Sequence, residues 1–489
     1  MLTEQLRYIA PELSLLCFAL AVILVDLFVK QKKVLPVIAV VGALVAAVFT
    51  IIMFGSPTSE AFYKMITVDQ FGMFFKLLIL AAVILVILAS NKYVLNFANF
   101  QGEYYAILML SAIGLMLLVS SINFISIFVS LELSSISLYA LVSFLKNKSS
   151  SEAGLKYLIL GAVASAILLY GMAFIFGLTG NTCLTCIAEY TKDMPVANLV
   201  ASPVLLIGLV LIIAGFGFKI ASFPFQMWVP DVYEGAPTTI TAYLSVASKA
   251  AGFAVVARIL MTAFGMPVWL HTDWGVIIAV LAALTMTVGN IVAIWQTNVK
   301  RLLGYSSIAQ AGYLMVGLAA MGMAAKPDAV TSSGLLFFLL SYTLTNLGAF
   351  IAIIAISNKI NSDNIDDYAG MAKRSPLLAV ALTLCLVSLT GLPPTAGLIA
   401  KIYIFTGAVN QGLLWLVIIA VINSVISAFY YFKVVKAMWM TEPKSEEKVT
   451  ASWPEWLALA FCCVLVVVIG VVPGIFINFT QAASKMLGI

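Results

Sequence analysis

The chain has 489 residues, of which 63% are hydrophobic and only 10% are charged. Soluble domains carry about 25% charged residues, so a water-soluble fold is excluded for this chain. A lipid bilayer is the expected solvent. The net charge of +5 comes without lysine-rich or arginine-rich runs interleaved with aromatic residues, which argues against nucleic acid as a partner.

Runs of about 20 apolar residues predict membrane-spanning helices, because lipid offers the backbone no other hydrogen-bond partner. No cleavage-site pattern precedes the first run, so we expect no removed signal peptide and no soluble domain. The fold class expected is therefore an all-α membrane protein of about fourteen spans, near residues 9–29, 34–54, 70–90, 104–121, 123–145, 153–178, 202–227, 238–263, 274–296, 301–323, 330–357, 376–409, 411–439 and 454–479.

The distribution of Lys and Arg predicts the orientation of the chain. If the N-terminus lies outside, fifteen of these residues fall on the inner side and only five on the outer side. Because basic residues are enriched in cytoplasmic loops, both termini are predicted to face outward. The five outer residues are Arg7, Lys64, Lys192, Lys326 and Lys485.

Two spans are interrupted by proline, which removes a helix hydrogen bond. The seventh contains Pro224, and the twelfth contains Pro393 and Pro394. Broken helices in corresponding positions of two halves are typical of inverted repeats. We therefore expect two antiporter-like repeats of five helices each, with this division of the chain: three N-terminal helices (1–103), the first repeat (104–263), the second repeat (274–439) and a C-terminal helix (454–489).

Glu132 and Lys219 are the first candidates for function, because ionisable groups deep in a membrane are rare and costly. Glu132 lies about ten residues into the fifth span, and Lys219 precedes the break in the seventh. We expect them to pair, so that the carboxylate sets the protonation state of the lysine. The alternative is a purely structural ion pair.

Lys249 and Lys401 extend this set toward the other half of the chain. Lys249 lies among small residues in the eighth span, and Lys401 follows the second break. Lysines exchange protons but do not bind cations well, so the pattern indicates a proton path; an anion pathway is a weaker alternative. The polar stretch 305–310, which ends in Gln310, is expected either to hold water between the two lysines or to bond neighbouring helices together.

Three other basic residues also lie within predicted spans. Lys156 either extends toward the inner surface or joins a path from Glu132 to that surface. Arg258 is expected to be structural and to reach the outer surface, whereas Lys76 stays without an assigned role.

The cysteines and the single histidine give no metal-ligand pattern. Cys183 and Cys186 form a CxxC in a loop, as two plain thiols or as an external disulfide. His271 is expected to be a solvated loop residue.

Residues 151–180, 223–260, 301–318 and 366–405 resemble the subunit N family of proton-pumping NADH:quinone oxidoreductase, bacterial respiratory complex I. The resemblance implies an antiporter-like fold with inverted repeats. It also implies that Glu132, Lys219, Lys249 and Lys401 form the proton path. Some relatives carry histidine where Gln310 stands, and Gln310 cannot titrate.

The same resemblance implies a proton-translocating subunit that binds no cofactor itself, with FMN, iron–sulfur clusters and quinone in other subunits. Its expected partners are further membrane subunits of complex I, including antiporter-like ones. The expected location is the bacterial inner membrane rather than a thylakoid-type membrane. An Mrp-type cation/proton antiporter subunit and a structural membrane scaffold are the alternatives.

Overall fold

A computed structural model of the chain describes residues 2–30, 32–94, 100–192, 201–265, 268–324 and 329–485. Within these residues, 13 helices are long and apolar enough to cross a membrane. Two shorter apolar helices, α17 (Pro376–Thr390) and α18 (Ala396–Asn410), correspond to the predicted twelfth span. The predicted all-α membrane fold of about fourteen spans is thus confirmed. Lys326, expected on the outer side, lies outside the described residues.

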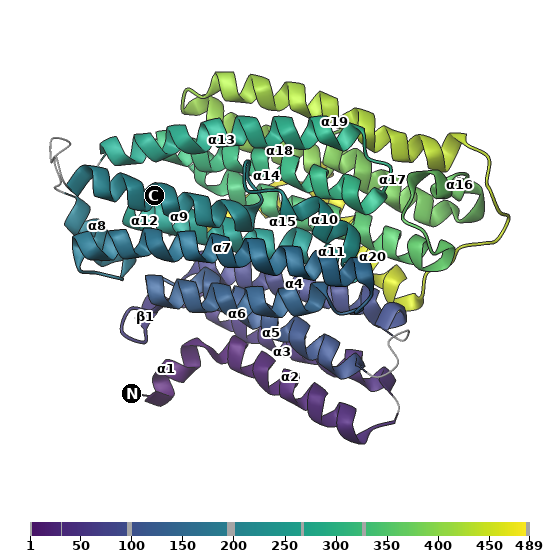
Figure 1. The fold of residues 1–489 in the computed structure, drawn as a ribbon, viewed down its shortest axis with the longest axis horizontal. Coiled ribbons are helices and arrows are strands. Elements are labelled where there is room, and N and C mark those ends of the chain that lie inside the picture. The colour runs from purple at the N-terminus through teal and green to yellow at the C-terminus, as the bar shows by residue number, and fades with distance from the viewer. Residues whose placement is uncertain are drawn as a thin grey trace.

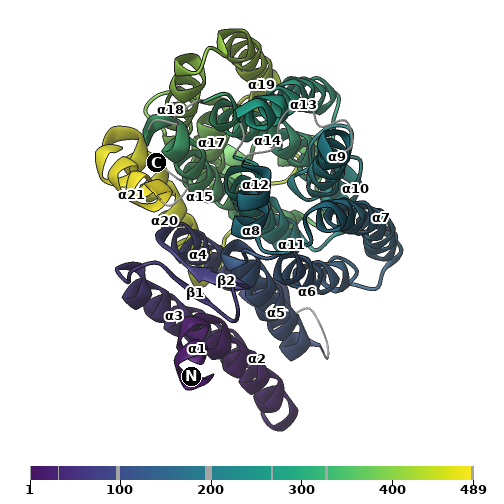
Figure 2. The ribbon, with the colours of Figure 1, turned by 90° about the vertical axis from the view of Figure 1, so that its left-hand side faces the viewer.

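The N-terminal helices form a layer on one side of the molecule. This layer contains α1 (Leu2–Tyr8), α2 (Ala10–Phe28), the short turn η1 (Lys32–Val34) and α3 (Leu35–Phe54). Figure 2 shows α2 and α3 beside α4 (Gln70–Val94) and α5 (Gln101–Ser120), against which they pack. Only 28% of the most apolar stretch of α2, and the same share of that of α3, is buried inside the protein, as expected for helices that contact lipid.

The remaining helices form the main bundle, and most lie roughly parallel (Figure 1). The spans α14 and α15 and the span that contains α12 are almost entirely buried and form its centre. The elements are α6 (Phe124–Val142), α7 (Lys148–Thr179), α8 (Leu184–Thr191), α9 (Ala201–Ile220), α10 (Trp228–Gly235), α11 (Thr238–Tyr243), the π-helical turn η2 (Leu244–Ser248), α12 (Lys249–Ala263), α13 (Val268–Ile294), α14 (Val299–Met323), α15 (Ala329–Ile360), η3 (Ile365–Tyr368), α16 (Met371–Arg374), α19 (Leu414–Met440), α20 (Trp453–Val471) and α21 (Gly474–Ser484).

Asparagine side chains begin several of the helices that carry the candidate residues. Asn123 caps α6, Asn147 caps α7 and Asn298 caps α14, each by accepting a hydrogen bond from a backbone N–H in the first turn. Such caps satisfy N–H groups that have no partner within the helix. They fix where α6 and α14 begin, and therefore the depth of the polar residues that follow.

Three local features differ from the sequence-based prediction. A β-hairpin of β1 (Ser59–Ala61) and β2 (Ile66–Val68) pairs antiparallel, with Ser59 opposite Val68. The predicted fourteenth span is divided into α20 and α21 at Pro473, because proline cannot continue a helix hydrogen-bond ladder. The polar loop near 179–201 contains the short helix α8.

The expectation that His271 is a solvated loop residue is wrong. His271 lies in α13 and is only 7% exposed. Its ring packs edge-on against Trp274, one turn further along the helix, with 5.2 Å between ring centroids. The helix begins earlier than the predicted ninth span, which places the histidine inside the protein.

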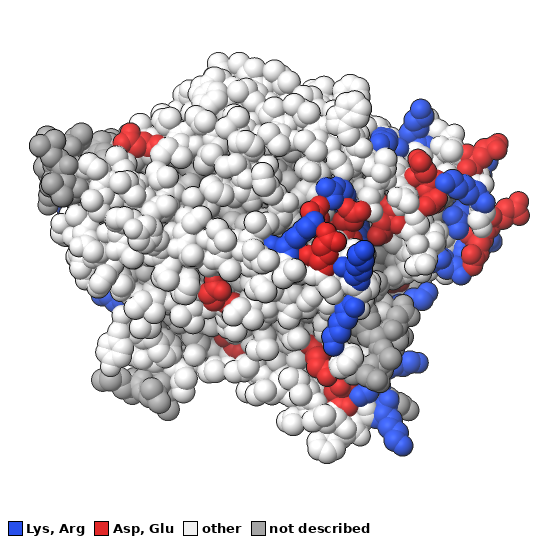
Figure 3. Space-filling model, in the orientation of Figure 1, with Lys and Arg blue, Asp and Glu red and all other residues white. Residues whose placement is uncertain are grey.

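Charged side chains gather at one end of the helix bundle. On the face drawn in Figure 3, most of them lie near the end that carries α16, and the middle of the bundle is almost free of charge. α1, β1 and α8 lie at the opposite end (Figure 1). This arrangement agrees with loops rich in lysine on one side, while the orientation of the chain in the membrane stays a prediction.

Candidate functional site

Lys219 lies in the last turn of α9, just before the helix is interrupted. The chain turns through residues 221–227, where the Phe223–Pro224 peptide bond is cis, and α10 begins at Trp228. Lys219 is 4% exposed, and its Nζ donates a hydrogen bond to Ser135 Oγ of α6 at 3.1 Å. The predicted break and its buried lysine are therefore present.

Glu132 does not contact Lys219 directly, contrary to expectation. Its Oε1 accepts a hydrogen bond of 2.5 Å from Ser165 of α7, and the side chain is partly exposed rather than buried. Ser135 is the hydrogen-bond partner of the ammonium, and Ser165 is that of the carboxylate.

A cavity of about 10 Å³ lies beside Lys219. A space of roughly 10–15 Å³, measured in this way, is needed to hold one water molecule. Ser135, Ser165 and Lys219 line the cavity together with Tyr139 and Gly161. A Cβ on residue 161 would lie 2.0 Å from Tyr139 Oη, so only glycine leaves room for the tyrosine here.

Lys249 occupies the centre of the bundle, at the start of α12 and directly after η2. It is 2% exposed. Its Nζ donates to the carbonyl oxygen of Ser307 and to Ser307 Oγ, both on α14. Tyr342 of α15 forms a hydrogen bond of 2.9 Å with the same hydroxyl, which extends the polar contacts of Lys249 toward α15.

Lys401 lies in α18, after the second break, and is 5% exposed. Its Nζ donates to Thr390 O at 2.7 Å, to Leu389 O at 3.1 Å and to Ser424 Oγ at 2.7 Å. The two carbonyls belong to the last turn of α17, where the break leaves them without helix partners. The broken helix thus supplies the oxygen atoms that hold the ammonium.

The contact between Lys401 and the end of α17 requires glycine at residue 391. Gly391 ends α17 with φ of +91°, and a Cβ there would lie 2.9 Å from Cδ of Lys401. The Pro393–Pro394 peptide bond within the break is cis. The structure therefore confirms that the twelfth span is broken, and Lys219 precedes its break whereas Lys401 follows its own.

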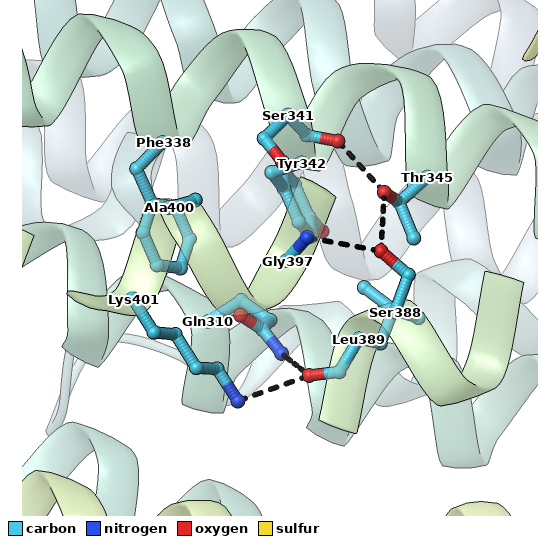
Figure 4. Close-up of a pocket in the computed structure, with 10 residues that line it drawn as sticks. All are labelled: Gln310, Phe338, Ser341, Tyr342, Thr345, Ser388, Leu389, Gly397, Ala400 and Lys401. Atoms are coloured by element: carbon cyan, nitrogen blue, oxygen red, sulfur yellow. Dashed lines mark hydrogen bonds between the residues drawn. The ribbon is translucent and has the colours of Figure 1, made fainter. Parts of the chain in front are cut away.

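Gln310 connects the predicted polar stretch of α14 to this second break. Its Nε2 donates to Leu389 O at 3.1 Å, the oxygen that also accepts from Lys401 (Figure 4). Gln310 also contacts Tyr431 Oη at 3.5 Å, and that hydroxyl forms a hydrogen bond with Ser306. Side chains therefore bridge much of the interval between Lys249 and Lys401, where the sequence analysis expected water.

A second cavity of about 10 Å³ lies beside Lys401. Gln310, Ser341, Tyr342 and Lys401 are among the residues that line it (Figure 4). Ser341 Oγ is buried and has no hydrogen-bond partner among the described residues. The space and the free hydroxyl suit one water molecule, as at Lys219.

The remaining basic residues within spans have clear partners. Lys156 is exposed and pairs with Glu152 and Asp231 at 2.9 Å each, so it does not contact Glu132. Arg258 is structural, as expected, but it does not reach the surface: it is 5% exposed and binds both carboxylate oxygens of Asp69. Lys76 pairs with Glu12 at 2.7 Å, and both are buried.

Sequence reasoning missed several of these groups. Glu12 was not considered, because it lies near the predicted start of the first span. Tyr342, Tyr431 and Ser424 look like ordinary polar residues of apolar helices, and only the fold brings them to the lysines. Their spacing along the chain carries no signal that could have identified them.

No cluster suited to a metal ion is present in the part of the chain that the structure describes: no three His, Cys, Asp or Glu side chains converge. Cys183 and Cys186 are free thiols, and Cys183 Sγ lies 3.0 Å from Thr185 Oγ1.

Comparison with known proteins agrees with this architecture. Residues 121–427 match the family model described as "NADH:quinone oxidoreductase/Mrp antiporter, TM". The chain is 46% identical over 480 residues to the NADH-quinone oxidoreductase subunit N of Dehalococcoides mccartyi, covering 98% of this chain and 99% of that protein. A chain of respiratory complex I from Thermus thermophilus aligns with a TM-score of 0.80 and 29% identity over 96% of this chain and 99% of that one.

A chain of the Mrp complex from Dietzia sp. shares the fold, with a TM-score of 0.84 at 18% identity over 100% of this chain and 98% of that one. By its fold and its broken, lysine-bearing spans, the protein is an antiporter-like membrane subunit. More particularly, the chain belongs to the NADH:quinone oxidoreductase/Mrp antiporter family, and the predicted resemblance to subunit N is confirmed over nearly its whole length.

Proposed function

We propose that this chain is the subunit N of a proton-pumping NADH:quinone oxidoreductase and that it moves protons along Glu132, Lys219, Lys249 and Lys401. Full-length similarity to subunit N chains supports the assignment to that complex. The observation that carries the mechanism is the set of three lysines, each buried inside a membrane bundle and each hydrogen-bonded to a serine hydroxyl. Buried ionisable groups in spans typically form proton relays.

Protons enter the buried set through the pair Glu132 and Lys219. While Glu132 is ionised, its charge stabilises the ammonium of Lys219. When Glu132 takes up a proton, this stabilisation is lost and burial favours the neutral amine. Lys219 then releases its proton to a water in the cavity or toward Lys249.

From Lys249 the proton moves through hydroxyl groups. A hydroxyl both donates and accepts, so it can pass a proton on, whereas a carbonyl only accepts and an amide does not titrate. The hydroxyls of Ser307 and Tyr342 lead from Lys249 to the cavity beside Lys401. One water in that cavity completes the route, and Gln310 and Leu389 O orient Lys401 without carrying the proton.

The division into inverted repeats, residues 104–263 and 274–439, is part of this proposal. Each half contains one broken helix, one buried lysine at the break and one cavity of about 10 Å³ beside that lysine. Lys156, in its ion-pair cluster with Asp231, lies outside the path and stabilises the contact between α7 and α10.

The energy comes from quinone reduction in partner subunits, which also hold the FMN, the iron–sulfur clusters and the quinone. The partners are further membrane subunits, including antiporter-like ones. The location is the bacterial inner membrane, with both termini on the outer side.

The experiment uses Lys219→Ala in the assembled complex, with the exposed Lys92→Ala as control. We expect turnover per assembled complex to fall several-fold for Lys219→Ala only. A structural scaffold predicts lower assembly but normal turnover per complex. An Mrp-type antiporter, supported by the shared fold and the shared family model, predicts sodium-dependent proton movement in vesicles without any redox substrate.

A further inference from the structure

The direction of the Lys249 side chain depends on the π-helical turn that precedes it. η2 spans Leu244–Ser248, and α12 begins at Lys249 itself. A π turn accommodates one residue more than an α turn, and such turns often occur at functional sites. One residue corresponds to about 100° of helix rotation, so a return to regular α-helix would turn Lys249 away from Ser307.

One side chain ties this turn to a neighbouring helix. Asn346 of α15 is 1% exposed, and its Nδ2 donates to Ser245 Oγ at 2.7 Å. Ser245 lies inside η2 and donates in turn to Ala242 O at 2.7 Å. Serine hydroxyls that bond back to a helix carbonyl alter the local helix geometry. The amide thus holds the hydroxyl at the irregular turn.

The same face of α15 also contacts Ser307 of α14, which is the acceptor of Lys249. Tyr342 lies four residues before Asn346, so the two side chains project from one side of the helix. Tyr342 bonds to Ser307 Oγ at 2.9 Å, the atom that accepts from Lys249 Nζ. α15 therefore fixes both the backbone that carries Lys249 and the hydroxyl that receives its proton.

We infer that Asn346 is the positioning residue of Lys249, acting through Ser245 and the π-helical turn rather than by contact with the proton. Its Oδ1 is buried and has no hydrogen-bond partner among the described residues. A buried acceptor without a partner is costly, which is unfavourable for a residue with only a packing role. This inference rests on the proposed proton path, since it gives Asn346 a role only if Lys249 carries protons.

The test uses the complete complex with Asn346→Ala, Ser245→Ala and the double variant. Misplacing a reacting group by about 1 Å costs up to about a hundredfold in rate, so we expect turnover per assembled complex to fall by about tenfold in each single variant. The double variant should lose no more than the single ones, because both remove the same contact. The pH profile of turnover should also shift, which a loss of packing alone would not produce.

Thr343→Val is the matched control. Thr343 is a buried residue of the same helix, and its Oγ1 has no hydrogen-bond partner among the described residues. We expect an unchanged pH profile for this variant. We also expect recovery of turnover when Asn346 is replaced by Gln, whose amide can donate the same hydrogen bond to Ser245. A wild-type pH profile in assembled Asn346→Ala, or losses that add in the double variant, would overturn the inference. A Lys249→Ala variant with normal proton pumping would instead contradict the proton path itself.

Discussion

Gln310 and Lys401 donate hydrogen bonds to one oxygen atom, the carbonyl of Leu389 at the end of α17. Both distances are 3.1 Å, although the residues come from α14 and α18. The break in the twelfth span exposes this oxygen, and the two side chains share it. The position of the lysine in the second half is therefore linked to the polar stretch of α14.

This relationship predicts the effect of changing Gln310. Gln310→Leu removes the donor to Leu389 O and to Tyr431, while the carbonyls of α17 still bind Lys401. We expect an assembled complex with several-fold lower turnover. Gln310→His restores a donor and should keep most of the activity. Quinone reduction per assembled complex measures the turnover of both variants. Equal activity of the Leu variant and wild type would show that the hydrogen bond from Gln310 to Leu389 O does not affect turnover.

Gly391 provides a test of the break itself. Its φ is +91°, which favours glycine. A Cβ at this position would also lie only 2.9 Å from Lys401 Cδ, so any larger residue is opposed. Left-handed backbone costs about 1–2 kcal/mol for a residue with a Cβ. Gly391→Ala should therefore lower thermal stability by about that amount and reduce turnover. Gly412 also has positive φ but open space around it, so Gly412→Ala should affect stability without reducing turnover.

The buried pair of Asp69 and Arg258 predicts a dependence of stability on pH. Burial acts to raise the pKa of Asp69, but the charge and hydrogen bonds of Arg258, with the N–H of Gly72, outweigh it and lower the pKa below its usual value. The stabilisation is therefore complete at neutral pH, and it is lost as the pH falls below the usual aspartate pKa toward the lowered one. Unfolding curves from pH 7 to acid should show this loss, and Asp69→Asn should flatten it.

Removal of one partner of this pair should also be costly. Breaking a buried ion pair typically costs about 3–5 kcal/mol, so Asp69→Asn should strongly reduce the amount of folded subunit at neutral pH. The more exposed pair of Lys32 and Asp26 is the control, since surface pairs contribute about 0–1 kcal/mol. Similar losses for Asp69→Asn and Lys32→Gln would contradict the structural role of the buried pair.

Glu12 and Lys76 join the N-terminal layer to the bundle, because α2 carries the acid and α4 the base. Lys76→Met alone leaves a buried carboxylate without its cation and should lower stability by about 3–5 kcal/mol. Glu12→Gln combined with Lys76→Met removes both charges and should recover much of that loss. Thermal unfolding of the complex measures this, and a double variant worse than both single ones would contradict the pairing.

The sequence predicted the membrane-spanning helices and their breaks, because the lipid environment determines them. Long apolar runs must form helices in a bilayer, so the spans from α2 to α19 agree with the expected ranges to within about seven residues. The breaks near Pro224 and Pro393 were predicted for the same reason, since proline removes a helix hydrogen bond. The short β-hairpin and α8 were missed because they lie outside the spans, where apolar length gives no signal.

Contacts between side chains of different helices were harder to predict. The pairing of Glu132 with Lys219 was inferred from charge alone, yet Lys219 bonds to Ser135 and Glu132 bonds to Ser165. The partners of Lys76 and Arg258 could not be identified, because Glu12 and Asp69 lie at helix ends in the sequence but are buried in the fold. Which faces of helices meet is decided by packing of the whole bundle, not by local pattern.

The most direct test of the proton path measures protons pumped per electron in the assembled complex that carries Lys401→Ala. The proposed path predicts that fewer protons are pumped per electron or that turnover is lost, because Lys401 is the last buried group of the set. Wild-type turnover with the wild-type ratio of protons to electrons would contradict a role of Lys401 in the path.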